Sequence, residues 1–99
     1  MKLAGVINIS IDSSVFDNCV ALKKVIINVQ VRVIGNSAFS MCKKLSSIIV
    51  YSKQLRTVGN KALKGVHNCK ISVPKIKLKP YKILFKNRGQ GKKVVVAKL

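Results

Sequence analysis

The sequence has almost no acidic side chains. Asp12 and Asp17 are its only carboxylates and His67 is its only histidine. These three residues cannot supply the paired carboxylates, or the nucleophile with its base and orienting group, that acid–base and nucleophilic catalysis require. Asp12 is better explained as a capping residue of a turn. We therefore expect no enzymatic activity and no catalytic residues.

Patterns that bind metals or phosphates are lacking as well. The candidates for soft-metal ligands are His67, Cys19, Cys42 and Cys69, and only His67 and Cys69 are close in sequence. Zinc sites usually show a short ligand pair such as Cys-x-x-Cys. Gly89-x-Gly91 is not a phosphate loop, because it follows a predicted helix instead of opening one. The sequence thus predicts no metal and no cofactor.

Long apolar runs are missing too, and none approaches the roughly 18 residues that a membrane helix needs. Residues 1–7 faintly resemble a signal peptide, but Asn8, Ser10 and Asp12 interrupt the apolar run and no small-residue cleavage site follows. The alternation over residues 7–11 fits a strand better. The chain is then either cytoplasmic or the end of a longer exported protein.

Basic residues, in contrast, are abundant. Twenty Lys and Arg give a net charge of +18, and fourteen of the twenty follow residue 50. Because 48% of the residues are hydrophobic, we expect a packed core in a single domain of 99 residues. Repulsion between so many cations favours acidic neighbours, whether a partner, a cell-wall polymer or a longer parent chain.

A repeat of 23 residues organises the chain. The first copy reads Ser14-x-Phe16-x-x-Cys19-x-x-Leu22-x-x-Val25-Ile26-Ile27, and the second reads Ser37-x-Phe39-x-x-Cys42-x-x-Leu45-x-x-Ile48-Ile49-Val50. Five positions are identical and the others exchange one apolar residue for another. A degraded third copy runs from Gly59 to Val73 with one residue inserted, and Pro74 ends the period. Such a period is typical of a solenoid, in which each turn of chain stacks on the last.

The spacing within each copy predicts its elements. Residues 22–27 and 45–50 alternate as strands of a parallel sheet, with Leu, Val and Ile pointing into the core. Residues 29–33 and 55–57 alternate again, which predicts a second extended segment in each coil, with Val29, Val31 and Val33 in phase. The turn at Gly35–Ser37 is expected to lead into a short helical turn that carries Phe39 inward.

A different pattern follows Pro74. Residues 75–88 are helical in composition, with an apolar stripe formed by Leu78, Tyr81, Leu84 and Phe85. Because Pro80 is tolerated only in the first turn of a helix, the helix should begin within a few residues of it. We expect repeat coils over residues 1–74, and a cap over residues 75–99 that consists of this helix and a final strand at residues 94–96.

These motifs resemble a known family. The order Gly-x-x-Ala-Phe-x-x-Cys-x-x-Leu-x-x-Ile-x-Val is similar to the BspA-type leucine-rich repeat, and the cap resembles the C-terminal unit of such proteins, so the resemblance covers roughly residues 12–98. Leu63, Cys69 and Pro80 depart from the family pattern. The resemblance implies an α/β fold, a right-handed leucine-rich-repeat solenoid of about three coils with a parallel sheet and a capping helix. It further implies a non-catalytic role in protein recognition or adhesion, in the extracellular space or at a bacterial cell surface.

One candidate binding surface is the outward face of the predicted sheet. Its residues are those between the core positions of the strands: Lys24, Ile26, Asn28, Ser47, Ile49, Tyr51 and Ser72. Two neighbouring exposed isoleucines beside a tyrosine form a candidate contact patch for a protein partner. The alternative is that these isoleucines merely favour strands on a solvated face.

The second candidate surface is the basic C-terminal half, which is suited to anionic wall polymers, glycans or nucleic acid. Its residues are Lys75, Lys77, Lys79, Lys82, Lys86, Arg88, Lys92 and Lys93. Because Lys outnumbers Arg seventeen to three and only Tyr51 and Tyr81 remain to stack on bases, we expect no specific nucleic-acid recognition. The alternative is that these lysines form an ordinary solvated face.

Two further expectations concern the N-terminal part of the chain. The first coil, at residues 4–11, is open on one side, so we expect it to be covered by preceding repeats or by self-association. Cys19 and Cys42 occupy one repeat position and should stack about 5 Å apart. Since both belong to the apolar pattern, we expect reduced thiols rather than a disulfide.

Overall fold

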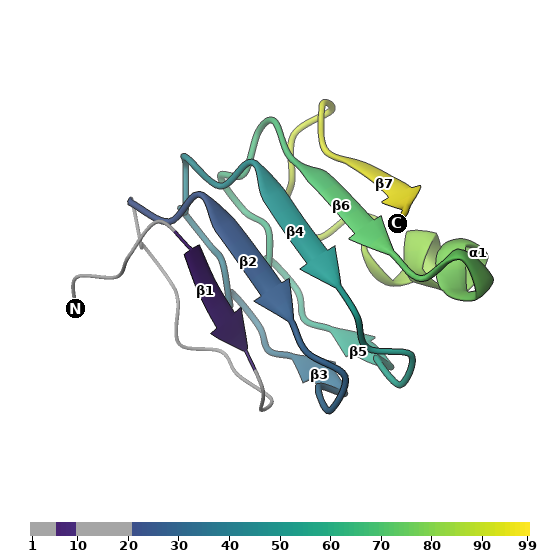
Figure 1. Ribbon diagram of the computed structural model, residues 1–99. Helices are drawn as coiled ribbons and strands as arrows, with labels where there is room; N and C mark the ends of the chain where they lie inside the picture. The colour runs from purple at the N-terminus through teal and green to yellow at the C-terminus, as the bar shows by residue number, and fades with distance from the viewer. Residues whose placement is uncertain (1–5, 10–20) are drawn as a thin grey trace.

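The computed structural model describes residues 6–9 and 21–99, and of residues 6–9 the backbone alone. The chain forms a five-stranded parallel sheet, a two-stranded parallel sheet behind it and one short α-helix (Figure 1). The main sheet contains, in spatial order, β1 (Val6–Ile9), β2 (Lys24–Ile27), β4 (Ser47–Val50), β6 (Lys70–Val73) and β7 (Val95–Lys98). The second sheet pairs β3 (Val33–Ile34) with β5 (Thr57–Val58), and the helical elements are the 3-10 helix η1 (Lys75–Lys77) and α1 (Leu78–Leu84).

The strand register confirms the repeat. Val25 of β2 pairs with Ile48 of β4, and Ile48 pairs with Ile71 of β6, so residues 23 apart occupy equivalent positions of one sheet. Val25, Ile48 and Ile71 are all fully buried, because alternate side chains of each strand point to the same face. The finding confirms an α/β repeat fold with a parallel sheet, whereas the right-handed winding and the number of coils stay predictions.

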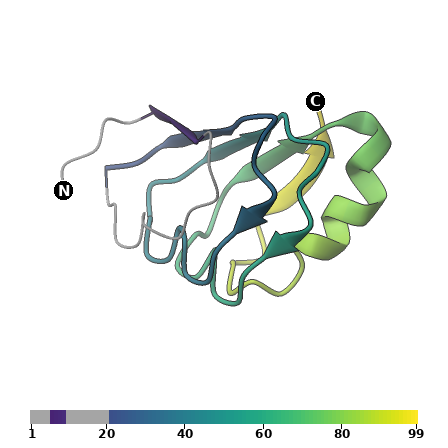
Figure 2. The same ribbon diagram turned by 90° about the horizontal axis from the view of Figure 1, so that it is seen from below.

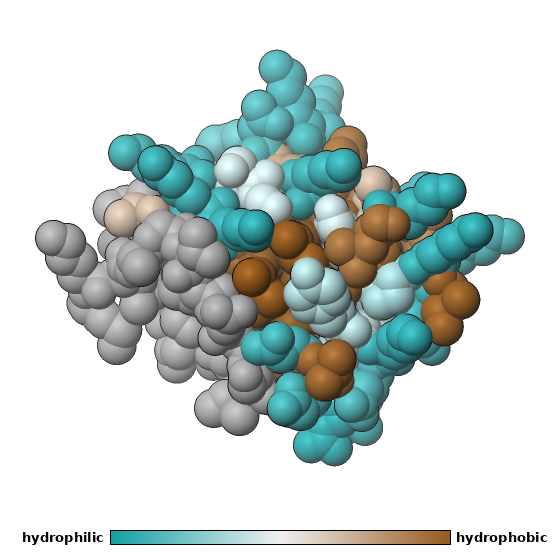
Figure 3. Space-filling view, in the orientation of Figure 1, coloured by the Kyte–Doolittle hydropathy of each residue, from teal (hydrophilic) through white to brown (hydrophobic). Residues whose placement is uncertain are grey.

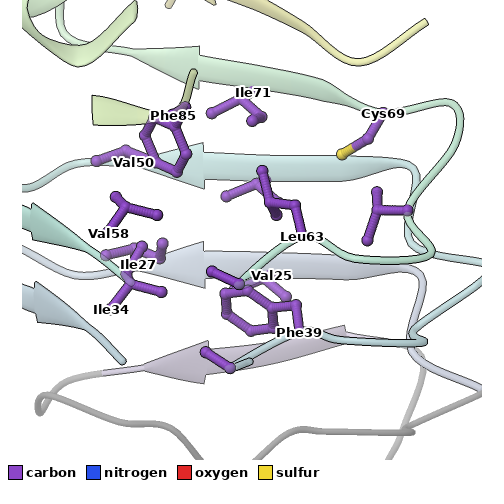
Figure 4. Close-up of a cluster of buried hydrophobic side chains, with 14 of the residues drawn as sticks. Val25, Ile27, Ile34, Phe39, Val50, Val58, Leu63, Cys69, Ile71 and Phe85 are labelled. Carbon is purple, nitrogen blue, oxygen red and sulfur yellow. The ribbon is translucent and has the colours of Figure 1, made fainter. Parts of the chain in front are cut away.

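The core lies between the two layers. Figure 4 shows Val25, Ile27 and Ile71 of the main sheet in one cluster of buried side chains with Phe39 and Leu63 of the opposite segments. Each of these side chains is at most 1% exposed. Burying a side chain of this size contributes about 1.5–3 kcal/mol to folding. The stability of the array therefore comes from apolar side chains stacked at the repeat positions.

The second layer differs in phase from the prediction. An extended segment is present in the two coils that contain β3 and β5, but the buried residues of the first of these segments are Val31 and Ile34, whereas Val29 is 58% exposed. The backbone turns at this point, since the Val31 N–H donates to the Asn28 oxygen over 3.2 Å. The predicted alternation of Val29, Val31 and Val33 is therefore wrong, because the turn interrupts the period of two.

The segment after the glycine turn, residues 35–42, holds Phe39 inward as predicted, but it forms no helix. Alternate N–H groups bond in two different directions. The N–H groups of Ala38, Ser40 and Cys42 donate to the residue three before them, and those of Ser37, Phe39 and Met41 donate to carbonyls 23 residues ahead. A helix is excluded because the next coil uses every second donor. Ser37 and Met41 have positive φ, as do their counterparts Lys61 and Gly65.

The C-terminal cap adds the predicted final strand, β7, to the main sheet beside β6. Residue 95 of β7 pairs with residue 70 of β6, a spacing of 25 in place of 23. The predicted helix begins at Leu78, so Pro80 lies in its first turn as expected. Seen from below, α1 follows β5 at the end of the second layer (Figure 2). The helix therefore occupies the position that a further second-layer strand would take.

Tyr81 of α1 is the residue that joins this helix to the preceding coil. Its side chain is 2% exposed, and Phe85, the next residue of the apolar stripe to be fully buried, is 1% exposed. Leu78 and Leu84 pack against the same core from partly buried positions. The predicted apolar stripe is confirmed, whereas the expectations for Phe16 and Cys19 lie outside the described residues.

Candidate binding surfaces

The outward face of the main sheet is built around Ile26 and Ile49. The two residues are register partners on β2 and β4, and each is half-buried between fully buried neighbours. The same register places Ser72 of β6 beside Ile49. Directly opposed residues on one face of a sheet have their side chains close enough to touch. The sequence thus located correctly which residues share this face.

The other predicted residues of this face surround the two isoleucines. Lys24 and Ser47 are register partners at the start of β2 and β4 and are half-buried. Asn28 and Tyr51 follow the ends of the same strands, Asn28 half-buried and Tyr51 45% exposed. In the space-filling view, hydrophobic atoms gather over the middle of the sheet and hydrophilic atoms surround them (Figure 3).

Two residues of β7 extend this face and were missed. Val95 pairs with Lys70, and Ala97 pairs with Ser72, so both continue the outward rows of the sheet. Val95 is 53% exposed and Ala97 is half-buried. A strand at residues 94–96 was predicted, but only its register tells which side chains face outward. The register could not be predicted because paired residues of β6 and β7 are 25 positions apart instead of 23.

The basic candidates are distributed over the cap. Lys75 and Lys77 lie in η1, Lys79 and Lys82 in α1, and the remaining four between α1 and β7. Six of the eight are exposed, and the two half-buried ones are Lys77 and Arg88. Lys82, Lys86 and Lys92 line one pocket of about 360 Å³. The other five do not line it.

Arg88 is engaged within the fold. Its Nε donates to the Leu84 oxygen over 2.8 Å, and one of its terminal nitrogens lies 3.5 Å from the Asn60 Oδ1. The guanidinium therefore caps the C-terminal end of α1, where carbonyls lack helical donors. Arg88 is one of the two predicted anion contacts that are half-buried.

Tyr81 must be removed from the residues available for stacking on bases. Its buried hydroxyl donates to the Ser52 oxygen over 2.8 Å and accepts from the Leu55 N–H over 3.1 Å. Burial raises the pKa of this phenol, and the hydrogen bonds with Leu55 and Ser52 partly offset the rise. Tyr51 alone of the two tyrosines is exposed.

No side chain in the described ranges 6–9 and 21–99 carries a negative charge, because Asp12 and Asp17 both precede residue 21. Basic side chains of these ranges therefore have no carboxylate side chain among the described residues to pair with. Solvent ions or an acidic partner would relieve the repulsion between them. This charge imbalance favours an anionic ligand wherever several lysines meet.

The described cysteines are core residues. Cys42 and Cys69 are at most 2% exposed and form no disulfide. Burial raises the pKa of the Cys69 thiol to about 12. Within the described part of the chain, no three His, Cys, Asp or Glu residues come close enough together to hold a metal ion. The prediction of no metal or cofactor remains a prediction.

Within the described residues, no helix has both the length and the apolar character needed to cross a membrane.

Comparison with known proteins agrees with this architecture. Residues 9–97 match the BspA type leucine rich repeat region in six copies. The chain therefore belongs to the BspA-type leucine-rich repeat family, as the 23-residue motif predicted. No curated protein and no solved structure matches it. Members of this family are typically non-catalytic binding modules.

Proposed function

We propose that this chain is a non-catalytic module for protein recognition or adhesion, and that it binds its partner through the outward face of the main sheet. The observation that carries the proposal is the register pair Ile26 and Ile49. Both isoleucines face outward, away from the core, and both remain partly accessible. Exposed apolar side chains grouped together and rimmed by polar groups are typical of protein contact sites.

The composition of the face supports a protein ligand. Tyr51 adds an exposed aromatic ring at one end, and such rings are enriched in protein interfaces. Val95 and Ala97 widen the apolar area toward the cap. Lys24 at one edge and Lys70 beside Val95 place positive charge at the rim. A partner with an apolar centre and an acidic rim would complement this surface.

The family alone supports placement at a bacterial cell surface, where its members are usually found. The same family resemblance supports a right-handed solenoid of about three repeat coils over residues 1–74, closed by a cap over residues 75–99 in one domain. We further propose that preceding repeats or a second copy covers the N-terminal end. Sedimentation as a strict monomer at high concentration would contradict self-association.

A matched pair of substitutions tests the sheet face. Ile49→Asp places a charge in the centre of the proposed patch, and Ile83→Asp places the same charge on α1 at a residue that is 71% exposed. The wild-type chain and both variants are immobilised and used to capture proteins from a cell extract. A partner bound by wild type and Ile83→Asp, but lost with Ile49→Asp, supports the proposal. Equal binding by all three chains contradicts it.

A second candidate function is attraction of anionic polymers by the basic C-terminal half. The specific observation in its favour is that the described residues contain many accessible lysines and no carboxylate side chain. Salt separates the two functions. Binding through the sheet face should survive about 0.5 M NaCl, whereas attraction between charges should collapse because screening then acts over a few ångströms.

A further inference from the structure

A pocket in the cap brings three of the basic residues together. It has a volume of about 360 Å³ and is lined by Lys82 of α1, Lys86 just after α1 and Lys92 just before β7. All three lysines are exposed, and the pocket is lined by no acidic side chain. Three cations around one hollow repel one another, so a bound anion would relieve this repulsion.

The turn after α1 is fixed by hydrogen bonds that engage two carbonyls at the C-terminal end of the helix. The Gln90 side chain accepts from the Arg88 N–H over 2.6 Å and donates to the Phe85 carbonyl. Arg88 donates to the Leu84 carbonyl over 2.8 Å. The end of a helix normally exposes such carbonyls and repels anions. Here two of them are already engaged, so the lysines dominate the field in the pocket.

One wall of the pocket is apolar. Val94 and Val96 are half-buried and line it together with the buried ring of Phe85. The remaining lining residues, Asn87, Gln90 and Gly91, lie on the turn between α1 and β7. A volume of this size lies at the lower end of small-molecule sites and exceeds what a bare oxyanion fills. The pocket therefore combines a cationic rim with room for a small organic group.

We propose that this pocket binds the phosphate or sulfate ester of a small organic molecule. The ester group carries up to two negative charges as a phosphate and one as a sulfate. It lies among Lys82, Lys86 and Lys92, since lysine binds such groups as a point charge. The organic part lies against Val94 and Val96. The proposal deepens the second candidate function, because it gives anion binding a defined position instead of a diffuse surface.

Chemical-shift mapping on the whole chain tests the proposal. The probes are glucose 6-phosphate, glucose 6-sulfate, inorganic phosphate and glucose, each titrated at a constant ionic strength of about 0.15 M. The two esters should shift the backbone amides of residues 85–92 with a saturable one-to-one isotherm, and glucose should shift none. Shifts that spread over lysines of the whole surface without saturation would overturn the pocket while leaving diffuse attraction intact.

Two triple variants of equal net charge isolate the pocket. Lys82→Gln, Lys86→Gln and Lys92→Gln together should weaken binding of glucose 6-phosphate about tenfold or more, because each exposed ion contact typically contributes about two- to fivefold. Lys43→Gln, Lys44→Gln and Lys53→Gln remove the same charge from exposed positions outside the pocket and should change the affinity less than about twofold. An equal loss in both variants would overturn the proposal. If the pocket variant fails to fold, the chemical-shift map of the unsubstituted chain still shows whether the esters bind at residues 85–92.

Two further comparisons of probes identify the chemistry of the ligand. Tighter binding of glucose 6-phosphate than of inorganic phosphate supports contact between the organic part and Val94 and Val96. Equal affinity of the two probes would show that these valines contribute nothing to binding. Dextran sulfate, which carries sulfate esters on a polymer, distinguishes a free ester from a unit of a chain. Saturable shifts at residues 85–92 with the polymer alone would overturn a small-molecule ligand, whereas shifts with both probes support a site that accepts free esters.

Discussion

The hydroxyl of Tyr81 donates a hydrogen bond to the backbone oxygen of Ser52 over 2.8 Å, across 29 residues of chain. The same hydroxyl accepts from the Leu55 N–H over 3.1 Å. Both partners lie in the connection between β4 and β5. The capping helix therefore completes the backbone hydrogen bonding of the coil that contains β4 and β5.

Replacing Tyr81 with Phe should lower the free energy of unfolding by about 1–3 kcal/mol, because a buried donor and a buried acceptor lose their partner. Chemical denaturation measures the change. Tyr51→Phe is the matched control, since Tyr51 is 45% exposed and its substitution should stay within about 0.5 kcal/mol. Equal effects of the two substitutions would show that the Tyr81 hydroxyl contributes nothing to stability.

The raised pKa of Tyr81 predicts a loss of stability at high pH. An unfolded tyrosine loses its proton near a pH of about 10, whereas burial holds the proton of Tyr81 to higher pH. Above that pH the unfolded chain binds fewer protons than the native one, so the free energy of unfolding falls as pH rises. Below it, the contribution of Tyr81 is fully present.

Lysines titrate in the same range, so the comparison is made between wild type and Tyr81→Phe, from a pH of about 8 to about 11. The wild-type chain should lose stability relative to the variant over the upper part of this range. Denaturation curves that keep a constant separation at every pH would contradict the prediction.

Gly59 is expected to tolerate no side chain. A Cβ at this position would collide with the backbone nitrogen and Cα of Asn36, one coil away. Gly59→Ala should therefore lower the free energy of unfolding by about 1–3 kcal/mol through overpacking. Adding Asn36→Ala should leave most of this loss in place, because the backbone atoms remain. Full recovery in the double variant would show that the Asn36 side chain is the obstacle.

The two described cysteines should resist alkylation in the native protein. Cys42 is fully buried, and burial raises the pKa of the Cys69 thiol to about 12. The reactive thiolate of Cys69 is therefore scarce near pH 8. Peptide mapping after iodoacetamide treatment should find both residues unmodified in buffer and modified in denaturant. Rapid modification of Cys69 in buffer would contradict its position in the core.

The repeat made most of the sheet predictable from sequence. The apolar spacing that ends in Ile27 and Val50 places both residues in the core, and the strand register bears this out. A fixed period works because equivalent residues of stacked coils share one environment. The same logic located Ile26 and Ile49 on the outward face.

Features that depend on a single long-range contact could not be predicted. The hydroxyl of Tyr81 meets residues 26 and 29 positions earlier, and no local pattern encodes that distance. Paired residues of β6 and β7 are 25 positions apart instead of 23, so the repeat did not predict that Val95 faces outward. The pocket of Lys82 and Lys92 likewise arises only when the turn after α1 folds back on β7.

The alternating hydrogen bonds of residues 37–42 make this coil depend on the one after it. The N–H groups of Ser37, Phe39 and Met41 are satisfied only while the next coil is in place. Opening of that coil would leave these three N–H donors without acceptors and would loosen the segment that holds Phe39. Damage at the cap therefore weakens the coil before it, and heat or pulling force should unfold the coupled coils cooperatively.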